Sequence, residues 1–193
     1  MSQSIAIANY FLTQDGKLRK KHDLTPMKLL KLVWFAHGWW MGLHPHPAAG
    51  GEESFTGAPL VGDEVPECWP WGPVFSVLYR SAKQYGNKPV EKLLKPYNYG
   101  FEIDDEPSPD LDTAFPSATE QNLRPFLDQI FAQYGQFSAS KLSNMTHLPG
   151  TPWKEVVDKY KGTPPRNIDI PNDLIFKYFK RMADAAKASQ QGA

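Results

Sequence analysis

The stretch from Leu24 to Gly42, LTPMKLLKLVWFAHGWWMG, constrains the fold of this chain more than any other. Thr25 can cap a helix, and Pro26 suits the first helical position, where a missing N–H costs nothing. Only a narrow stripe of the helix is polar or small, and it holds Lys28, Lys31 and Gly38. A helix that is apolar over most of its circumference must be covered on several sides. The segment therefore predicts a central buried helix, at about residues 26–41, in a mainly α, single-domain helical bundle.

The same segment does not predict a membrane span. Two lysines fall within its first two turns, and the apolar run from Leu32 is far shorter than the ~20 residues that a bilayer needs. Residues 1–17 lack the basic region and the long apolar run of a signal peptide. A single cysteine, Cys68, leaves no internal disulfide and is typical of a reducing compartment. We therefore expect a cytoplasmic protein.

The charge of the chain is balanced, with 21 Lys and Arg against 21 Asp and Glu in 193 residues. No global field therefore attracts it to nucleic acid or to anionic lipid. A basic run at residues 17–22 continues to Lys28 and Lys31. This 17–31 segment leaves a nucleic-acid-binding regulator open as an alternative function, which a steep dependence of affinity on salt would reveal.

The remaining segments predict more helices and one small hairpin. Apolar spacing and capping signals place helices at 4–14, 73–84 and 117–134, and others starting at about 138, 152 and 171. Two short apolar runs around Gly62-Asp63-Glu64 predict a β-hairpin at about 59–70. We expect the acidic stretch 101–116, which holds six carboxylates and no Lys or Arg, to be an exposed loop. One domain over residues 1–185 and a frayed tail at 186–193 complete the prediction.

Candidate catalytic and metal-ligating residues are few. Cys68 with His37 or His147 could form the thiol–imidazole pair of nucleophilic catalysis. A lone cysteine is more often a small buried hydrophobe, and we expect His37 to be a hydrogen-bonded core residue and His147 to cap a helix end. His44 and His46 share a loop but lack the further ligands that zinc requires. Because the chain also lacks a glycine-rich phosphate loop, we expect no enzyme, metal site or cofactor.

The aromatic residues give a positive signal for binding. Six tryptophans and eight tyrosines exceed what a core of this size requires, and Trp and Tyr dominate interface energetics when exposed. Trp39 and Trp40 are about 100° apart on one helix, so both can hardly enter the same packing seam. We predict that at least one of Trp39, Trp69 and Trp71 is exposed on a groove that receives a partner protein. The candidate partner-binding residues are Trp39, Trp69, Trp71, Tyr79, Lys28 and Lys31.

Three blocks of sequence, taken in order, resemble one family. They are LTPMKLLKLVWFAHGWW (24–40), ECWPWGPVFSVLYR (67–80) and YGQFSASKLSNMTHLPGTPW (134–153), the last followed by IDIPNDLIFKYF (168–179). Their recurrent features are a T-P-x-K-L-x-K-L opening, a W-x-x-G-P-V type of turn and an L-S-x-x-T-H…P-W segment. The chain resembles the Panacea domain, also called the SocA-like or phage-associated GepA-like domain, over about residues 5–182.

The resemblance implies an antitoxin of a bacterial or prophage toxin–antitoxin system, which neutralises a partner toxin by direct protein–protein binding. The alternative within the same family is an adaptor that delivers the toxin to a cellular protease. The toxins of the family are diverse, so the resemblance names no particular one. The acidic stretch 101–116 departs from the family pattern.

Overall fold

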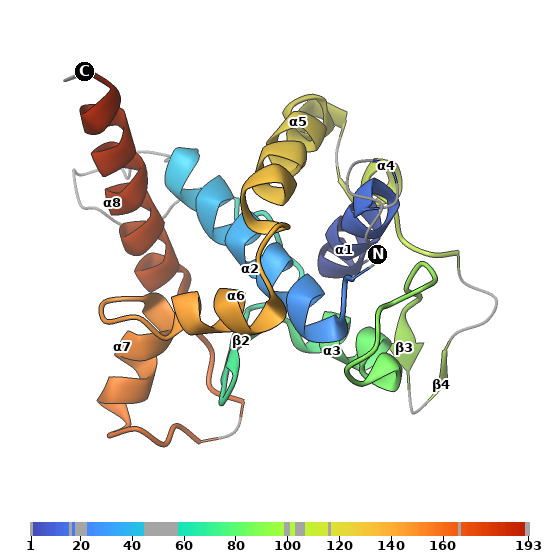
Figure 1. Ribbon diagram of the computed structural model, residues 1–193, viewed down its shortest axis with the longest axis horizontal. Helices are drawn as coiled ribbons and strands as arrows, with labels where there is room; N and C mark the ends of the chain where they lie inside the picture. The colour runs from blue at the N-terminus through green and yellow to red at the C-terminus, as the bar shows by residue number, and fades with distance from the viewer. Residues whose placement is uncertain are drawn as a thin grey trace.

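The fold is mainly α, as predicted, in a computed structural model that describes residues 2–15, 17, 23–44, 58–98, 101–102, 107–115, 117–165 and 167–191. Figure 1 shows α2 at the centre, with α8 on one side and α1 and α5 on the other. The elements in chain order are α1 (Gln3–Gln14), α2 (Pro26–Leu43), β1 (Glu67–Trp69), β2 (Gly72–Val74), α3 (Ser76–Ala82), the 3₁₀ helix η2 (Lys83–Tyr85), β3 (Tyr97–Asn98), β4 (Phe101–Glu102), α4 (Leu111–Ala114), α5 (Ser117–Tyr134), α6 (Ala139–Thr146), α7 (Pro152–Lys159) and α8 (Asn172–Gln191).

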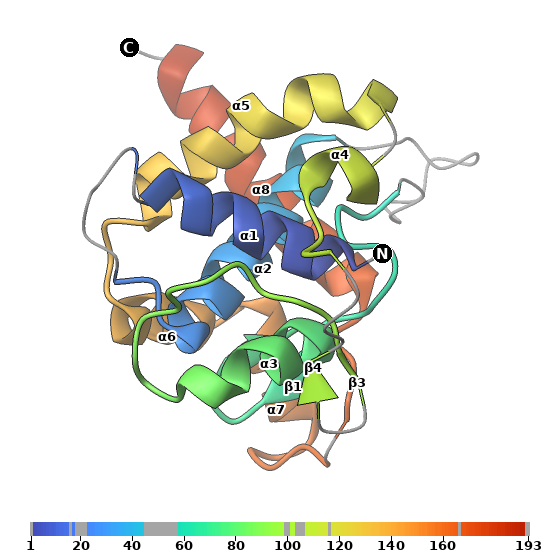
Figure 2. The same cartoon turned by 90° about the vertical axis from the view of Figure 1, so that its right-hand side faces the viewer.

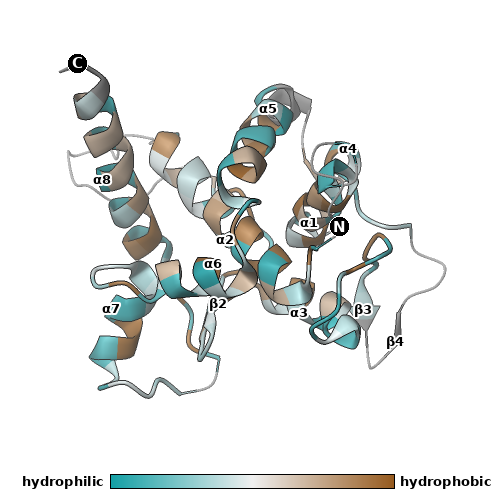
Figure 3. Cartoon of the chain, viewed as in Figure 1, coloured by the Kyte–Doolittle hydropathy of each residue, from teal (hydrophilic) through white to brown (hydrophobic). Residues whose placement is uncertain are grey.

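The central buried helix is confirmed as α2. Thr25 caps it by accepting a hydrogen bond from the Lys28 amide, and Pro26 occupies its first turn. α2 contacts α1, α3, α5, α6, α8 and β2, so it is covered on several sides. Figure 3 shows hydrophobic residues along α1 and α2, and Figure 2 shows α1 crossing in front of α2. Within the described parts of the chain, no helix combines the length and the apolar character that crossing a membrane requires.

Two glycines let α8 approach α2 closely. A Cβ atom at Gly38 would lie 2.1 Å from the Phe179 ring, and one at Gly42 would lie 2.6 Å from the Phe179 carbonyl carbon. Real Cβ atoms essentially never come this close to another heavy atom. The small residues of α2 therefore form the seam against which α8 packs.

The two lysines of α2 are buried, so the 17–31 segment is not one exposed basic patch. Lys28 is paired with Asp23 at 3.0 Å, and the Lys31 ammonium donates a hydrogen bond of 2.9 Å to the Pro73 carbonyl. Both lysine side chains are at most 2% exposed. Lys17 is exposed, and residues 18–22 lie outside the described residues. The lysines were expected on a polar stripe of the helix. Both are instead buried, Lys31 against a carbonyl of β2 and Lys28 against a carboxylate that precedes α2.

The predicted β-hairpin exists, but it is shifted along the chain: β1 lies within the expected range 59–70, and its partner is β2 at 72–74 rather than the run at Leu60-Val61. The two strands pair antiparallel, with Trp69 opposite Gly72. Pro70 and Trp71 connect them, and Gly72 adopts φ +100°, which favours glycine. Pro at the first central position of a turn presets the backbone for the reversal. The turn of the hairpin is therefore formed by Pro70 and Trp71, and not by Gly62-Asp63-Glu64.

The segment predicted as the first half of the hairpin is instead a loop attached to helices. Leu60 and Val61 are buried in the core without forming a strand. The Gly62 amide donates to the Gln3 side chain, and the Glu64 carboxylate accepts from the Val77 amide. Through these hydrogen bonds the loop connects α1 with α3. The loop is therefore held by helix residues and not by pairing with another strand.

Three boundaries differ from the sequence prediction. Pro73 lies in β2, so α3 begins at Ser76 rather than at residue 73. The acidic stretch 101–116 is not wholly a loop, because it contains β4 and α4; its residues 103–106 and 116 lie outside the described residues. α8 continues to Gln191, beyond the expected end at residue 185. Residues 186–191, AKASQQ, contain neither Gly nor Pro, so no strong helix breaker interrupts this last part of α8.

His37 is a hydrogen-bonded core histidine, as expected. Its side chain is wholly buried in α2, and its Nδ1 accepts a hydrogen bond of 3.2 Å from the Val61 amide. The imidazole packs edge-on against Phe75, with ring centroids 5.3 Å apart. This residue therefore ties the 58–64 loop to the central helix.

The burial of His37 predicts a loss of stability in mild acid. Burial lowers the pKa of His37 to about 3, whereas the pKa in an unfolded chain is about 6.5. Between these values the unfolded state binds a proton that the folded state does not, so acid favours unfolding. From pH 6.5 to 5.5 we expect His37 to remove about 1 kcal/mol from the free energy of unfolding. Urea unfolding of the wild type and of His37→Gln at several pH values measures this contribution to the free energy of unfolding. Equal pH dependence in both proteins would show that His37 is not the group responsible.

Candidate partner-binding surface

The 70–71 turn of the hairpin presents an exposed tryptophan. Trp71 is 71% exposed, more than any other large apolar side chain that the structure describes. The exposure expected for at least one of Trp39, Trp69 and Trp71 is therefore confirmed at Trp71, and the binding of a partner there stays a prediction. Each strand of the hairpin is only three residues long, and a two-stranded hairpin alone is marginally stable in water. The position of Trp71 must therefore depend on contacts from the rest of the fold.

α6 supplies the contacts to the turn itself. The Ser143 hydroxyl donates a hydrogen bond of 2.9 Å to the Trp71 carbonyl. His147 caps the C-terminus of α6, as expected, with Nδ1 2.6 Å from the Ser143 carbonyl. Its Nε2 lies 3.3 Å from the Pro70 carbonyl. Both residues of the turn thus have their carbonyls next to polar side-chain atoms of one helix.

α7 and α2 hold the two strands beside the turn. The Trp153 indole donates a hydrogen bond of 2.7 Å to the Trp69 carbonyl. On the other strand, the Lys31 ammonium of α2 binds the Pro73 carbonyl, and burial lowers the pKa of Lys31 to about 7. The residues whose side chains reach the hairpin carbonyls, here called the hairpin supports, are Lys31, Ser143, His147 and Trp153.

The three sequence blocks that carry the family resemblance meet at this hairpin. The first contributes Lys31, the second is the hairpin itself, and the third contributes the other hairpin supports. Gly72 allows the close approach, because a Cβ atom there would lie 2.5 Å from the Thr146 hydroxyl oxygen and 3.0 Å from the Lys31 ammonium. The recurrent residues of the resemblance therefore build one local structure.

Trp69 and Tyr79 lie together beside the turn. Their rings meet edge-on with centroids 4.7 Å apart, and both are half-buried. The Trp69 indole donates a hydrogen bond of 2.8 Å to the Glu67 carboxylate. The structure thus brings Trp69, Trp71 and Tyr79 to one region. Lys31 is buried and supports this region through its hydrogen bond to the Pro73 carbonyl.

Trp39 and Lys28 do not join this region. The Trp39 indole donates a hydrogen bond of 2.6 Å to the Tyr134 hydroxyl of α5, and its ring packs edge-on against Phe179 of α8. Lys28 is engaged with Asp23 before the start of α2. The six candidate residues therefore do not form one surface.

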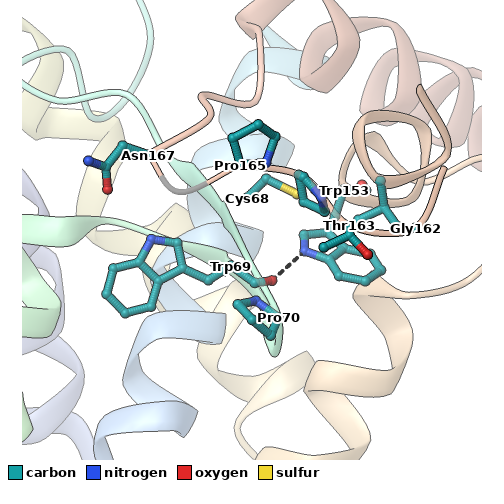
Figure 4. A pocket seen from close by; sticks show the side chains of 10 residues that line it. Cys68, Trp69, Pro70, Trp153, Gly162, Thr163, Pro165 and Asn167 are labelled. Carbon is teal, nitrogen blue, oxygen red and sulfur yellow. Dashed lines mark hydrogen bonds between the residues drawn. The ribbon is translucent and has the colours of Figure 1, made fainter. Parts of the chain in front are cut away.

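A pocket of about 670 Å³ adjoins the hairpin, within the usual size range of ligand sites. Figure 4 shows Trp69 and Trp153 on opposite sides of it, joined by the hydrogen bond to the Trp69 carbonyl. The pocket could not be predicted from the sequence, because its walls come from distant segments of the chain. Its lining residues are Cys68, Trp69, Pro70, Trp153, Val157, Gly162, Thr163, Pro164, Pro165 and Asn167.

Cys68 is a buried cysteine, as expected. Its sulfur lies 3.9 Å from the Trp153 carbonyl oxygen, and burial raises the pKa of the thiol to about 11. The proposed catalytic partners have other contacts: Val61 binds the His37 ring, and the His147 ring lies between two carbonyls. The thiol is therefore protonated at neutral pH and its observed polar contact is a main-chain oxygen.

Of the two histidines that closely follow Gly42, the structure describes His44, at the end of α2. The His44 ring stacks on Trp40 at 4.1 Å, and His46 lies outside the described residues. Among the residues that are described, no group of three or more His, Cys, Asp and Glu side chains is placed to hold a metal ion.

Comparison with known proteins supports the family suggested by the sequence blocks. A family model described as Antitoxin SocA-like, Panacea domain, matches residues 29–154. A relative named Antitoxin SocA, from Caulobacter vibrioides (strain NA1000 / CB15N), is 28% identical over 160 residues, which is 82% of this chain and 71% of that protein. No solved structure gives a significant match. The matched range includes the hairpin and all the hairpin supports.

Proposed function

Because this chain belongs to the Antitoxin SocA-like, Panacea domain family, we propose that it neutralises a partner toxin by binding it directly. The observation that carries the proposal is the exposure of Trp71 at the turn of a hairpin whose main chain is held by side chains of three helices. Tryptophan is strongly enriched among the residues that dominate binding energy. A side chain presented on an ordered main chain loses little further freedom when it binds. The turn is thus suited to dock against another protein.

The proposed contact extends from Trp71 to the neighbouring pocket. Trp69 and Pro70 line the pocket and immediately precede Trp71 in the chain, so the two features are continuous. We propose that the toxin covers Trp71 and inserts an apolar side chain between Trp69 and Trp153. The indole and proline surfaces of the pocket match such a side chain.

The nucleic-acid alternative has less support. Lys28 and Lys31 are buried and have oxygen partners within the chain, so they are not available to phosphates. A nucleic-acid contact would have to use other cations and would weaken steeply as salt is raised. An affinity for DNA or RNA that falls steeply as salt is raised would support a nucleic-acid-binding regulator instead.

Co-expression tests the proposed function. The product of the adjacent reading frame is expressed alone and together with this chain, and growth and toxin half-life are measured in strains with and without the cellular protease. Direct neutralisation predicts that growth is restored in both strains and that the toxin accumulates as a complex. Rescue only in the strain that has the protease, with a shortened toxin half-life, would instead support the adaptor alternative.

A further inference from the structure

We infer that Ser143 is a positioning residue for partner recognition, because its side chain holds the main chain that presents Trp71. This inference rests on the proposed function and assigns a role to a residue outside the docking surface. Ser143 lies in α6 with its side chain 6% exposed, so it has almost no area to offer a partner. Its effect on binding must therefore pass through the Trp71 carbonyl that it contacts.

The hydrogen bond acts at the point where the hairpin has least support of its own. Pairing between β1 and β2 ends at Trp69 and Gly72, which leaves Pro70 and Trp71 outside the ladder. Pro70 has no amide hydrogen to donate. The Ser143 bond of 2.9 Å therefore restrains the turn residue that the strand pairing does not reach.

Ser143 is itself held in place from two directions. Its carbonyl oxygen accepts a hydrogen bond of 2.7 Å from the Thr146 hydroxyl, and Nδ1 of His147 lies 2.6 Å from the same oxygen. The hydroxyl that points to the turn thus belongs to a well-supported part of α6. A donor on such an element orients the turn before the partner arrives, which lowers the ordering cost of binding.

The expected effect is a loss of affinity that depends on the Trp71 side chain. Removing the Ser143 hydroxyl frees the turn, so part of the binding energy of Trp71 must be used to order it. Since one intramolecular hydrogen bond contributes a modest net stabilisation, we expect Ser143→Ala to weaken toxin binding about 3- to 10-fold. In a Trp71→Ala background the same change should alter affinity by less than about 2-fold, because no anchor remains to be positioned.

A double-mutant cycle tests this inference, with the dissociation constants of wild type, Ser143→Ala, Trp71→Ala and the double variant measured against the purified product of the adjacent reading frame. Ser138→Ala is the matched control, because Ser138 caps the N-terminus of the same helix and bonds the Lys141 amide rather than the hairpin. Thermal unfolding of each variant identifies any general loss of stability. The inference predicts strong coupling between Ser143 and Trp71 and an unchanged affinity for Ser138→Ala.

Each other outcome has a definite meaning. An equal loss from Ser143→Ala in both backgrounds, or an equal loss from Ser138→Ala, overturns the positioning role and leaves the docking surface standing. An unchanged affinity for Trp71→Ala overturns the docking surface and the positioning role together. The absence of any complex with the wild type overturns the proposed function itself.

Discussion

Trp71→Ala is expected to weaken toxin binding about 30- to 1,000-fold, the range of a residue that contributes 2–4 kcal/mol at an interface. The side chain is 71% exposed in this chain alone, so a partner that covers it removes a large apolar area from water. The same exposure means that the fold does not need the indole. We expect the free energy of unfolding to change by no more than about 0.5 kcal/mol. Calorimetric titration and urea unfolding of the same preparations measure the two quantities.

The control is an exposed apolar side chain in another part of the molecule. Leu93 is 48% exposed and lines a small pocket with residues of α1 and α4. Leu93→Ala should therefore leave toxin affinity within about 2-fold of the wild type, since residues remote from an interface rarely affect it. If both variants bind as tightly as the wild type, the hairpin is not the docking site.

Gly42→Ala is expected to lower the free energy of unfolding by about 2 kcal/mol or more. In an unconstrained helix the same change would raise stability by about 1 kcal/mol, because alanine is the better helix former. At this position the new methyl would lie 2.6 Å from the Phe179 carbonyl carbon and 2.8 Å from the Lys180 nitrogen. Main-chain atoms of a helix cannot rotate away, so α8 must move, and such overpacking costs typically 1–3 kcal/mol and sometimes more.

Gly62→Ala is the matched control for Gly42→Ala. A Cβ atom at Gly62 would lie 3.7 Å from its nearest neighbours, which is an ordinary contact distance. We therefore expect this variant to unfold within about 0.5 kcal/mol of the wild type. Urea unfolding of both variants decides the matter; a Gly42→Ala protein that is more stable than the wild type would show that α2 and α8 are not packed as closely as described.

The helices could be predicted from the sequence because their signals are local. Thr25, Ser138 and Thr151 were each expected to start a helix, and each accepts a hydrogen bond from the amide three residues later. The central position of α2 followed from its apolar circumference. Caps and periodicity depend on neighbouring residues alone, so a single sequence contains enough information to place them.

The hairpin was predicted, but the position of its second strand and the burial of the two lysines were not, because these features depend on distant segments. The pairing of β1 depends partly on a distant segment, since the Cys68 amide binds the Ile168 carbonyl and the Ile170 amide binds the Pro66 carbonyl. Lys31 is buried because the Pro73 carbonyl, far along the chain, accepts its hydrogen bond. A lysine with such a partner has the same appearance in sequence as a solvated one.

The candidate surface was predictable only in part. The surplus of aromatic residues correctly indicated that one of three named tryptophans is exposed, and Trp71 is that residue. The contact of Ser143 with Trp71 and the pocket between Trp69 and Trp153 could not be predicted, because they join α6 and α7 to a hairpin about 70–85 residues earlier in the chain. Residues of all three sequence blocks meet at one hairpin in the fold.

We propose that this chain inhibits a toxin by binding it, and a titration of purified components separates this mechanism from delivery to a protease. The activity of the toxin is measured at increasing amounts of this chain, with no protease present. We predict that inhibition rises linearly to completion at a fixed molar ratio and that a complex of the two proteins elutes in gel filtration. Inhibition by direct binding would be contradicted by a toxin that stays fully active at a molar excess of this chain. It would also be contradicted by a toxin that catalytic amounts of this chain inactivate without forming a complex.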